Sequence, residues 1–225
     1  MRPQLERLPQ WLHPVALKVP DVDASTLSPR IADPPSDARQ SAVLMLFGDG
    51  TAGPDLLLTE RAHTMRTHAG QVSFPGGRVD PVDADPAATA LREAEEEVGL
   101  APSSVEVFGE LPPLWLPPSN SAVTTVLGWW SRPGPVLAIS DREVASVFRT
   151  PVADLLDPAN RFTVQGPSGW RGPGFRVADG LVLWGFTAGV ISRLFEQVGW
   201  EREWDQSRLE PYPRAPAQSP LAGPP

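Results

Sequence analysis

Residues 85–100, with the sequence DPAATALREAEEEVGL, limit the possible folds of this chain more than any other segment. Asp85 is a residue type that caps helix N-termini, Pro86 suits a first helical turn, and Gly99 suits a helix end. Apolar residues recur at a spacing of four, three and four, which gives one stripe on a helix: Ala87, Leu91, Ala94 and Val98. The segment therefore predicts an amphipathic helix over 86–98 that packs one face against a core.

Three glutamates lie on a second face of this predicted helix. Glu93, Glu96 and Glu97 stand at positions i, i+3 and i+4, so their carboxylates repel one another unless water screens them or a cation binds. Mg²⁺ and Mn²⁺ prefer oxygen ligands and would relieve this repulsion. The chain has no Cys, which restricts any metal to oxygen or histidine ligands. A solvated acidic face is the competing interpretation of a glutamate-rich helix taken alone.

The residues around the glutamates favour the metal site. Gly76 and Gly77 let the backbone approach a ligand closely, and Arg92 can orient a neighbouring carboxylate. The segment resembles the Nudix box, G-x5-E-x7-R-E-U-x-E-E-x-G-U with U aliphatic, at Gly77, Arg92, Glu93, Glu96, Glu97, Gly99 and Leu100. The gap from Gly77 to Arg92 is one residue longer than in that pattern. Asp83, with Asp80 nearby, replaces the loop glutamate.

This resemblance implies an α+β fold, the Nudix-type α/β/α sandwich with a mixed central sheet. It also implies metal-dependent hydrolysis of a diphosphate with Mg²⁺ or Mn²⁺ as cofactor. Glu93 and Glu97 would be the main metal ligands. Glu96 would be a third ligand or would help to activate water, and the backbone carbonyl of Gly77 would be a further ligand.

The segment directly upstream, LLTERAHTMRTHAGQVSFPGG at 57–77, carries the substrate prediction. It places Arg61, Arg66 and His68 within eight residues, and these side chains can donate hydrogen bonds to phosphate. L-L-T-x-R, a second Arg five residues on, Gly70, and F-P-G-G from Phe74 resemble the coenzyme A pyrophosphatase subfamily of Nudix hydrolases. The resemblance implies that substrate is bound by Arg61, Arg66, His68, Gly70 and Phe74. The alternative is that Arg61 and Arg66 pair with surface acids such as Glu60.

The same subfamily resemblance extends to S-D-R-E-V-A at 140–145 and L-W-G-F-T-A at 183–188. It implies cleavage of coenzyme A, or a derivative, into 4′-phosphopantetheine (or its acyl form) and adenosine 3′,5′-bisphosphate. Nudix enzymes often take a general base or extra metal ligand from a loop after the box, and we predict Glu143 in this catalytic role. A surface loop glutamate is the alternative.

Two other functions stay open. One is a Nudix diphosphatase for another nucleoside diphosphate compound, such as ADP-ribose, NADH or a nucleotide. The other is a non-catalytic nucleotide-binding regulator, although such proteins usually lose box carboxylates and this chain keeps three glutamates and Arg92. Trp129 and Trp130 could stack on adenine, but paired Trp residues on a strand more often belong to a core or interface.

The composition sets apart a Pro-rich N-terminal extension (1–40) and a disordered Pro-rich tail (205–225), and the resemblance implies a Nudix hydrolase domain at 41–204 between them. Strands are expected at 42–47, 56–59, 72–74, 105–111 and 123–130, with a β-ribbon from 162–164, 175–177 and 181–184. Helices are expected at 5–12, 86–98, 150–156 and 186–198.

The overall charge and the hydropathy narrow the range of partners. A net charge of −8 argues against nucleic-acid or membrane binding, and neither a signal peptide nor a membrane-spanning run is visible. We therefore expect a cytoplasmic protein that acts on a small nucleotide-type molecule, and a homodimer is compatible with the sequence.

Overall fold

The computed structural model describes residues 4–28, 33–65, 68–166 and 169–213. The strands are β1 (Arg39–Gly50), β2 (Gly53–Arg61), β3 (Val72–Ser73), β4 (Gly76–Arg78), β5 (Val105–Glu110), β6 (Leu114–Leu116), β7 (Ser121–Trp130), β8 (Val144–Pro151), β9 (Arg161–Gln165), β10 (Arg171–Arg176), β11 (Val182–Leu183) and β12 (Leu209–Pro211). The α-helices are α1 (His13–Lys18), α2 (Ala24–Leu27), α3 (Pro86–Val98), α4 (Val152–Leu156) and α5 (Gly185–Gln197). Within these ranges, no helix combines the length and the apolarity that crossing a membrane requires.

The central sheet is mixed, as predicted. β1 pairs antiparallel with β2 and β4 and parallel with β7. Alternate residues of β1 enter two separate cores, since Leu44 and Leu46 pack on one face while Met45 and Phe47 pack on the other. A strand with both faces buried must lie inside a covered sheet, so each face needs its own layer.

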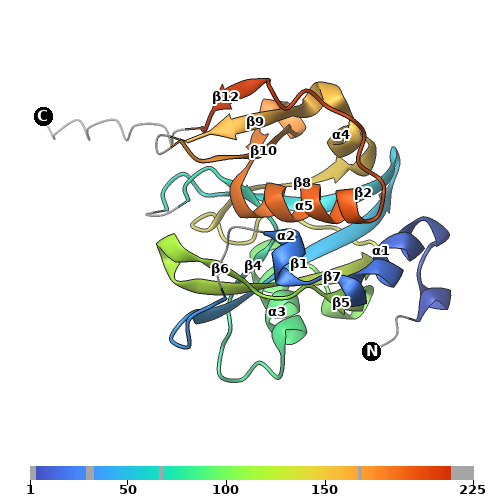
Figure 1. The fold of residues 1–225 in the computed structure, drawn as a ribbon. Helices are drawn as coiled ribbons and strands as arrows, with labels where there is room; N and C mark the ends of the chain where they lie inside the picture. Colours follow the sequence, from blue (N-terminus) through green and yellow to red (C-terminus); the bar gives the residue numbers. More distant parts are fainter. Residues whose placement is uncertain (1–3, 29–32, 66–67, 167–168, 214–225) are drawn as a thin grey trace, which may run out of the picture.

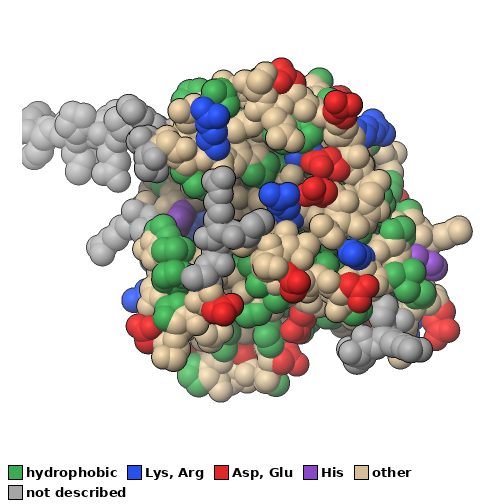
Figure 2. Space-filling model, viewed as in Figure 1, with side chains coloured by type: hydrophobic (Ala, Val, Ile, Leu, Met, Phe, Trp, Pro, Cys, Tyr) green, Lys and Arg blue, Asp and Glu red, His purple; other side chains and the backbone are tan. Residues whose placement is uncertain are grey.

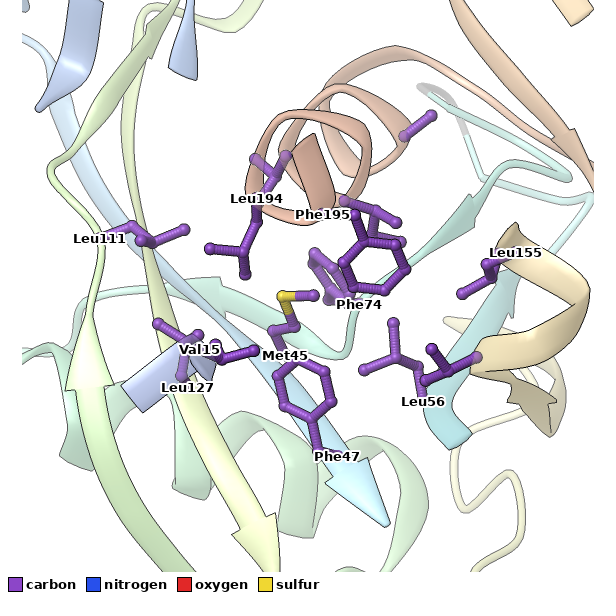
Figure 3. Packing of buried hydrophobic residues seen from close by; sticks show 14 of the residues in the cluster. Val15, Met45, Phe47, Leu56, Phe74, Leu111, Leu127, Leu155, Leu194 and Phe195 are labelled. Carbon is purple, nitrogen blue, oxygen red and sulfur yellow. The ribbon is translucent and has the colours of Figure 1, made fainter. Parts of the chain in front are cut away.

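Helices α3 and α5 supply the two covering layers. Figure 1 shows α3 on one side of the sheet and α5 on the other. The predicted apolar stripe of α3 packs against Leu44 and Leu46. Ala94 and Val98 are fully buried there, as is the neighbouring Ala90, whereas Ala87 and Leu91 are partly buried. On the opposite face, Leu194 and Phe195 of α5 point toward Met45 and Phe74 (Figure 3). This arrangement confirms the α/β/α sandwich and fixes the position of the glutamate-bearing helix.

The predicted N-terminal extension packs into the same core as the central domain. Short 3₁₀ turns at Leu5–Arg7 and Gln10–Leu12 lead into α1. Leu12 is fully buried, and the ring of Trp11 lies 6.1 Å from Phe47. The composition of 1–40 suggested a separate segment because Pro breaks long helices, but the short turns between the prolines still bury apolar side chains.

The C-terminal region adds a second sheet in the order β11-β10-β9-β12, above α5 in Figure 1. The prediction of a disordered tail from 205 is wrong for residues 205–213, because β12 pairs in parallel with β9. Residues 214–225 lie outside the described residues. Arg161 is buried and donates to the Oε1 atom of Glu201 over 2.7 Å, while its guanidinium lies 4.4 Å from the centroid of the Trp204 ring. These contacts hold the chain after α5 against the second sheet.

Candidate active site

Helix α3 distributes its three box glutamates over different depths. The Oδ1 atom of Asp85 accepts from the Ala88 N–H over 2.7 Å and starts the helix, as predicted. Glu97 is 6% exposed, whereas the side chain of Glu96 is 60% exposed and Glu93 is half-buried. The spacing i, i+3, i+4 therefore spans a boundary, with Glu97 directed toward the sheet and Glu96 toward solvent.

Gly76 and Gly77 bring the backbone of β4 against these carboxylates. The Gly76 N–H donates to the Oε2 atom of Glu97 over 3.0 Å. A Cβ atom on Gly77 would lie 2.5 Å from the carboxyl carbon of Glu93, so a side chain there would displace this carboxylate. Gly76 has φ +153° and also packs tightly on β1 at Val43. Gly76 is thus required for the close approach of β4 to β1, and Gly77 leaves room for the Glu93 carboxylate in its present position.

Arg92 is anchored by Asp83, the residue that replaces the loop glutamate of the box. The Nε and Nη2 atoms of Arg92 donate to the two carboxylate oxygens of Asp83 over 3.0 and 2.9 Å. Thr89 Oγ1 also donates to Asp83. The remaining guanidinium nitrogen, Nη1, lies 3.0 Å from Glu93 Oε1 and 3.2 Å from Glu96 Oε2. The longer, Asp-containing loop therefore still orients an arginine that holds two box glutamates.

The carboxylates at this site are electrostatically coupled. Burial raises the pKa of Glu97 to about 7, against the stabilising hydrogen bond from Gly76 and the charge of Arg61. Burial also raises the pKa of Glu93, while the hydrogen bond and charge of Arg92 oppose this rise. The charge of Glu143 raises the pKa of both Glu93 and Glu97. Three carboxylates from the helix and a distant loop thus lie within electrostatic range of one another.

Arg61 and Glu143 reach this region through the pairing of β2 with β8. Arg61 pairs with Val144, and the Ala62 N–H donates to the backbone carbonyl of Glu143 over 2.9 Å. The buried Nε of Arg61 has no hydrogen-bond partner among the described residues. Buried polar groups are nearly always paired, so a half-buried guanidinium next to Glu97 is suited to an incoming anion.

The carboxylate of Glu60 has other partners. It accepts from Ser146 Oγ over 3.0 Å and lies 3.1 Å from the His63 Nε2 atom. Glu60 is therefore paired with Ser146 and His63, and not with Arg61 as the alternative interpretation expected. The sequence pattern predicts no role for His63 or Ser146, because nothing near them distinguishes them from ordinary surface residues.

The other predicted substrate residues that the structure describes make contacts of their own. Phe74 is only 2% exposed and packs in the main hydrophobic core, so its prediction as a substrate-binding side chain is wrong. Gly70, at φ +69°, shapes a turn against His63. His68 is exposed, with Nδ1 2.7 Å from Gln71 Oε1. Arg66 lies outside the described residues.

The paired tryptophans follow the core interpretation. Trp130 is buried and its Nε1 atom donates to Ser104, while the ring of Trp129 lies 5.9 Å from Trp11. Both side chains are therefore occupied by contacts within the fold.

The donor set suits a hard divalent cation. It consists of carboxylate oxygens, partly buried and mutually repelling, which a cation would stabilise. As placed, no three acidic or histidine side chains in the described part of the chain are arranged to hold a metal ion. Arg92 already holds Glu93 and Glu96, so their carboxylates would have to rotate from Arg92 to become ligands.

Comparisons with known proteins bear on the family and the fold of this chain. The NUDIX domain family matches residues 38–166. An uncharacterized Nudix hydrolase named NudL from Shigella flexneri serotype 5b (strain 8401) is 42% identical over 177 residues, which cover 77% of this chain and 90% of that protein. NudL of Escherichia coli (strain K12) matches with the same identity and coverage. The crystal structure of a Nudix hydrolase from M. smegmatis, RenU, matches with a TM-score of 0.51 at 19% identity, covering 75% of this chain and 91% of that one.

Proposed function

Because this chain belongs to the Nudix hydrolase family, we propose that it hydrolyses the diphosphate of coenzyme A or a derivative with Mg²⁺ or Mn²⁺. The products would be 4′-phosphopantetheine, or its acyl form, and adenosine 3′,5′-bisphosphate. One observation supports the diphosphatase part: the buried Nε of Arg61 has no hydrogen-bond partner among the described residues, and the charge of Arg61 acts on Glu97, whose carboxylate also feels the charges of Glu93 and Glu143. The coenzyme A part is supported by the sequence of 57–77.

The chain's own residues supply most of the chemistry. Glu93 and Glu97 would hold the cation, with Glu96 and the Gly77 carbonyl as further ligands. A bound Mg²⁺ or Mn²⁺ neutralises diphosphate oxygens and polarises phosphorus. Arg61 would donate to a phosphate oxygen and keep the diphosphate in place.

Glu143 would accept the proton of the attacking water. The water oxygen forms a bond to one phosphorus, and the bond from that phosphorus to the bridging oxygen breaks. The second phosphate leaves with the bridging oxygen. Water is the nucleophile, so the reaction needs no nucleophilic side chain.

A panel of diphosphates tests the substrate. Purified protein is incubated with Mg²⁺ or Mn²⁺ and coenzyme A, acetyl-coenzyme A, ADP-ribose, NADH or a nucleoside triphosphate, and products are identified by mass. We expect the coenzyme A compounds to give the highest kcat/KM. Turnover of another diphosphate without turnover of coenzyme A or its thioesters would overturn coenzyme A as the proposed substrate, but it would still agree with a Nudix diphosphatase. Absence of any turnover would favour the alternative function, a non-catalytic nucleotide-binding regulator.

Variants of Arg61 and His68 can distinguish a residue that binds the diphosphate from a residue that binds the 3′-phosphate. Because Arg61 lies beside Glu97, Arg61→Ala should lower kcat/KM alike for coenzyme A and 3′-dephospho-coenzyme A, and Arg61→Lys should restore part of it. His68→Ala should affect only coenzyme A if His68 meets the 3′-phosphate. A loss in Arg61→Ala confined to coenzyme A would move Arg61 to the 3′-phosphate.

Glu143→Gln tests the general base. The substitution keeps the shape of the side chain but removes its basic oxygen, so kcat should fall by a factor on the order of 10²–10⁴ with little change in KM. The exposed Asp141, two residues away, provides the control variant Asp141→Asn. Full activity of Glu143→Gln would leave Glu143 as a surface residue.

A further inference from the structure

Three aromatic side chains from different strands meet at one end of the second sheet. Trp170 precedes β10, Trp184 follows β11 and Tyr212 follows β12. The ring centroids of Trp170 and Trp184 are 6.3 Å apart at an angle of 62°, and those of Trp184 and Tyr212 are 5.3 Å apart at 60°. Trp184 is therefore the central ring of a cluster assembled from separate parts of the chain, which we call the aromatic cluster.

The aromatic cluster is open to solvent. Trp170 is 41% exposed, and Trp184 and Tyr212 are half-buried. The ring of Trp170 lies over Gly172, where a Cβ atom would come within 2.5 Å of it. The glycine thus allows this ring to lie close to the strand. The cluster presents flat apolar surface that the described fold does not cover.

The cluster also adjoins the catalytic segment. β11 lies against β3, the strand that leads through Phe74 into Gly76 and Gly77. Leu183 and Phe74, at the ends of these two strands, are buried in one core. Trp184 directly follows Leu183, and Phe74 lies two residues before Gly76, so this shared core connects the cluster to the segment that contacts the glutamates.

We propose that the aromatic cluster, with Trp184 at its centre, stacks the adenine base of the substrate. Aromatic side chains bind nucleobases by stacking, and several tilted rings give such a base both a face and an edge to contact. The inference rests on the proposed function only in requiring a substrate that contains adenine. It deepens that function by assigning the base to the second sheet and leaving the phosphates to Arg61 and the glutamates.

Binding of the isolated product tests the cluster without catalysis. Calorimetric titration with adenosine 3′,5′-bisphosphate in EDTA should show about a tenfold or larger loss of affinity in Trp184→Ala, the scale of one stacked base. Trp184→Phe should keep most of the affinity. Binding of 4′-phosphopantetheine, which has no base, should be unchanged. An unchanged affinity for the bisphosphate, or equal losses for both compounds, would overturn the stacking role.

A distant tryptophan provides the control. Trp200 follows the C-terminus of α5 while Trp184 precedes its N-terminus, about 20 Å away for a helix of this length. Trp200→Phe should leave both affinities unchanged, and circular dichroism should show that all variants are folded. If ADP-ribose proves to be the substrate in place of coenzyme A, a KM increase in Trp184→Ala with that compound would still support the cluster. A normal KM would refute it.

Discussion

Glu97 combines burial, a backbone hydrogen bond and two nearby like charges in a single side chain. Glu97→Gln keeps the hydrogen bond from Gly76 but removes the negative charge that the proposed cation would bind. We therefore expect hydrolysis to fall at least about 100-fold and the affinity for Mn²⁺ to fall as well. Glu95→Gln is the matched control, because Glu95 is exposed on the same helix. Equal kcat/KM in the two variants would contradict Glu97 as a ligand.

The raised pKa of Glu97 predicts how the free energy of unfolding depends on pH. In the folded protein the group has a pKa of about 7, against 4.5 for an ordinary glutamate, so between these values the folded state binds more protons. The free energy of unfolding in EDTA should therefore fall as pH rises from about 4.5 to 7, by up to about 3 kcal/mol. Urea unfolding at several pH values measures this fall, which Mg²⁺ should reduce. Glu97→Gln should lack this part of the pH dependence.

Asp83 acts through Arg92. Asp83→Asn weakens two charge-assisted hydrogen bonds and frees the guanidinium to pair more closely with Glu93 and Glu96. Since groups that orient metal ligands usually change metal affinity about 10–100-fold, we expect a loss of that size in Mn²⁺ binding. The neighbouring Asp80→Asn, which only alters a loop contact with Val82, should have little effect. A loss as large in Asp80→Asn would show that the loop conformation, and not the contact with Arg92, is responsible.

The residue spacing gave the glutamate cluster and the proximity of Arg92 to it, because helix geometry is local. It could not rank Glu97 as buried and Glu96 as exposed, because that depends on where β4 meets the helix. The burial of Phe74 could not be predicted for the same reason. F-P-G-G is one segment in sequence, but in the fold its phenyl ring enters the core while its glycines face the glutamates.

At the level of elements, periodicity located both long helices and the long strands β1, β2 and β7, but the eight-residue strand β8 (Val144–Pro151) was not predicted. α3 has the predicted bounds 86–98, and α5 begins one residue before the predicted 186. The short strands β4, β6 and β12 were missed because three residues carry no period. The predicted helix at 150–156 begins at Val152, since Thr150 and Pro151 complete β8.

The N-terminal turns give a direct test of their packing. Leu12 is fully buried against the central sheet, whereas Leu17 on α1 is 58% exposed. Leu12→Ala should lower the free energy of unfolding by about 2–5 kcal/mol, the range for buried leucines. Leu17→Ala should change it by less than about 0.5 kcal/mol. Urea unfolding of both variants checks this, and an equal small effect would mean that the segment contributes little to the core.

For the molecule as a whole, the net charge of the protein has the same sign as the charge of a diphosphate substrate. The net charge is −8, and Figure 2 shows acidic and basic side chains interspersed over one face. Any diphosphate is an anion, so the long-range field opposes its approach, while Arg61 attracts it only locally. Salt screens charges beyond about 8 Å at physiological ionic strength, and therefore weakens the long-range repulsion more than the local contact.

Raising KCl at constant free Mg²⁺ should therefore increase kcat/KM, by less than about tenfold. The increase should be larger in Arg61→Ala, because that variant loses a local attraction and retains the repulsion. Steady-state rates of both proteins across a salt series measure the two slopes. A fall of kcat/KM with salt in the native protein, absent from Arg61→Ala, would mean that the cluster around Arg61 steers the substrate despite the acidic surface. Falls of equal size in both would place the attracting charge elsewhere on the molecule.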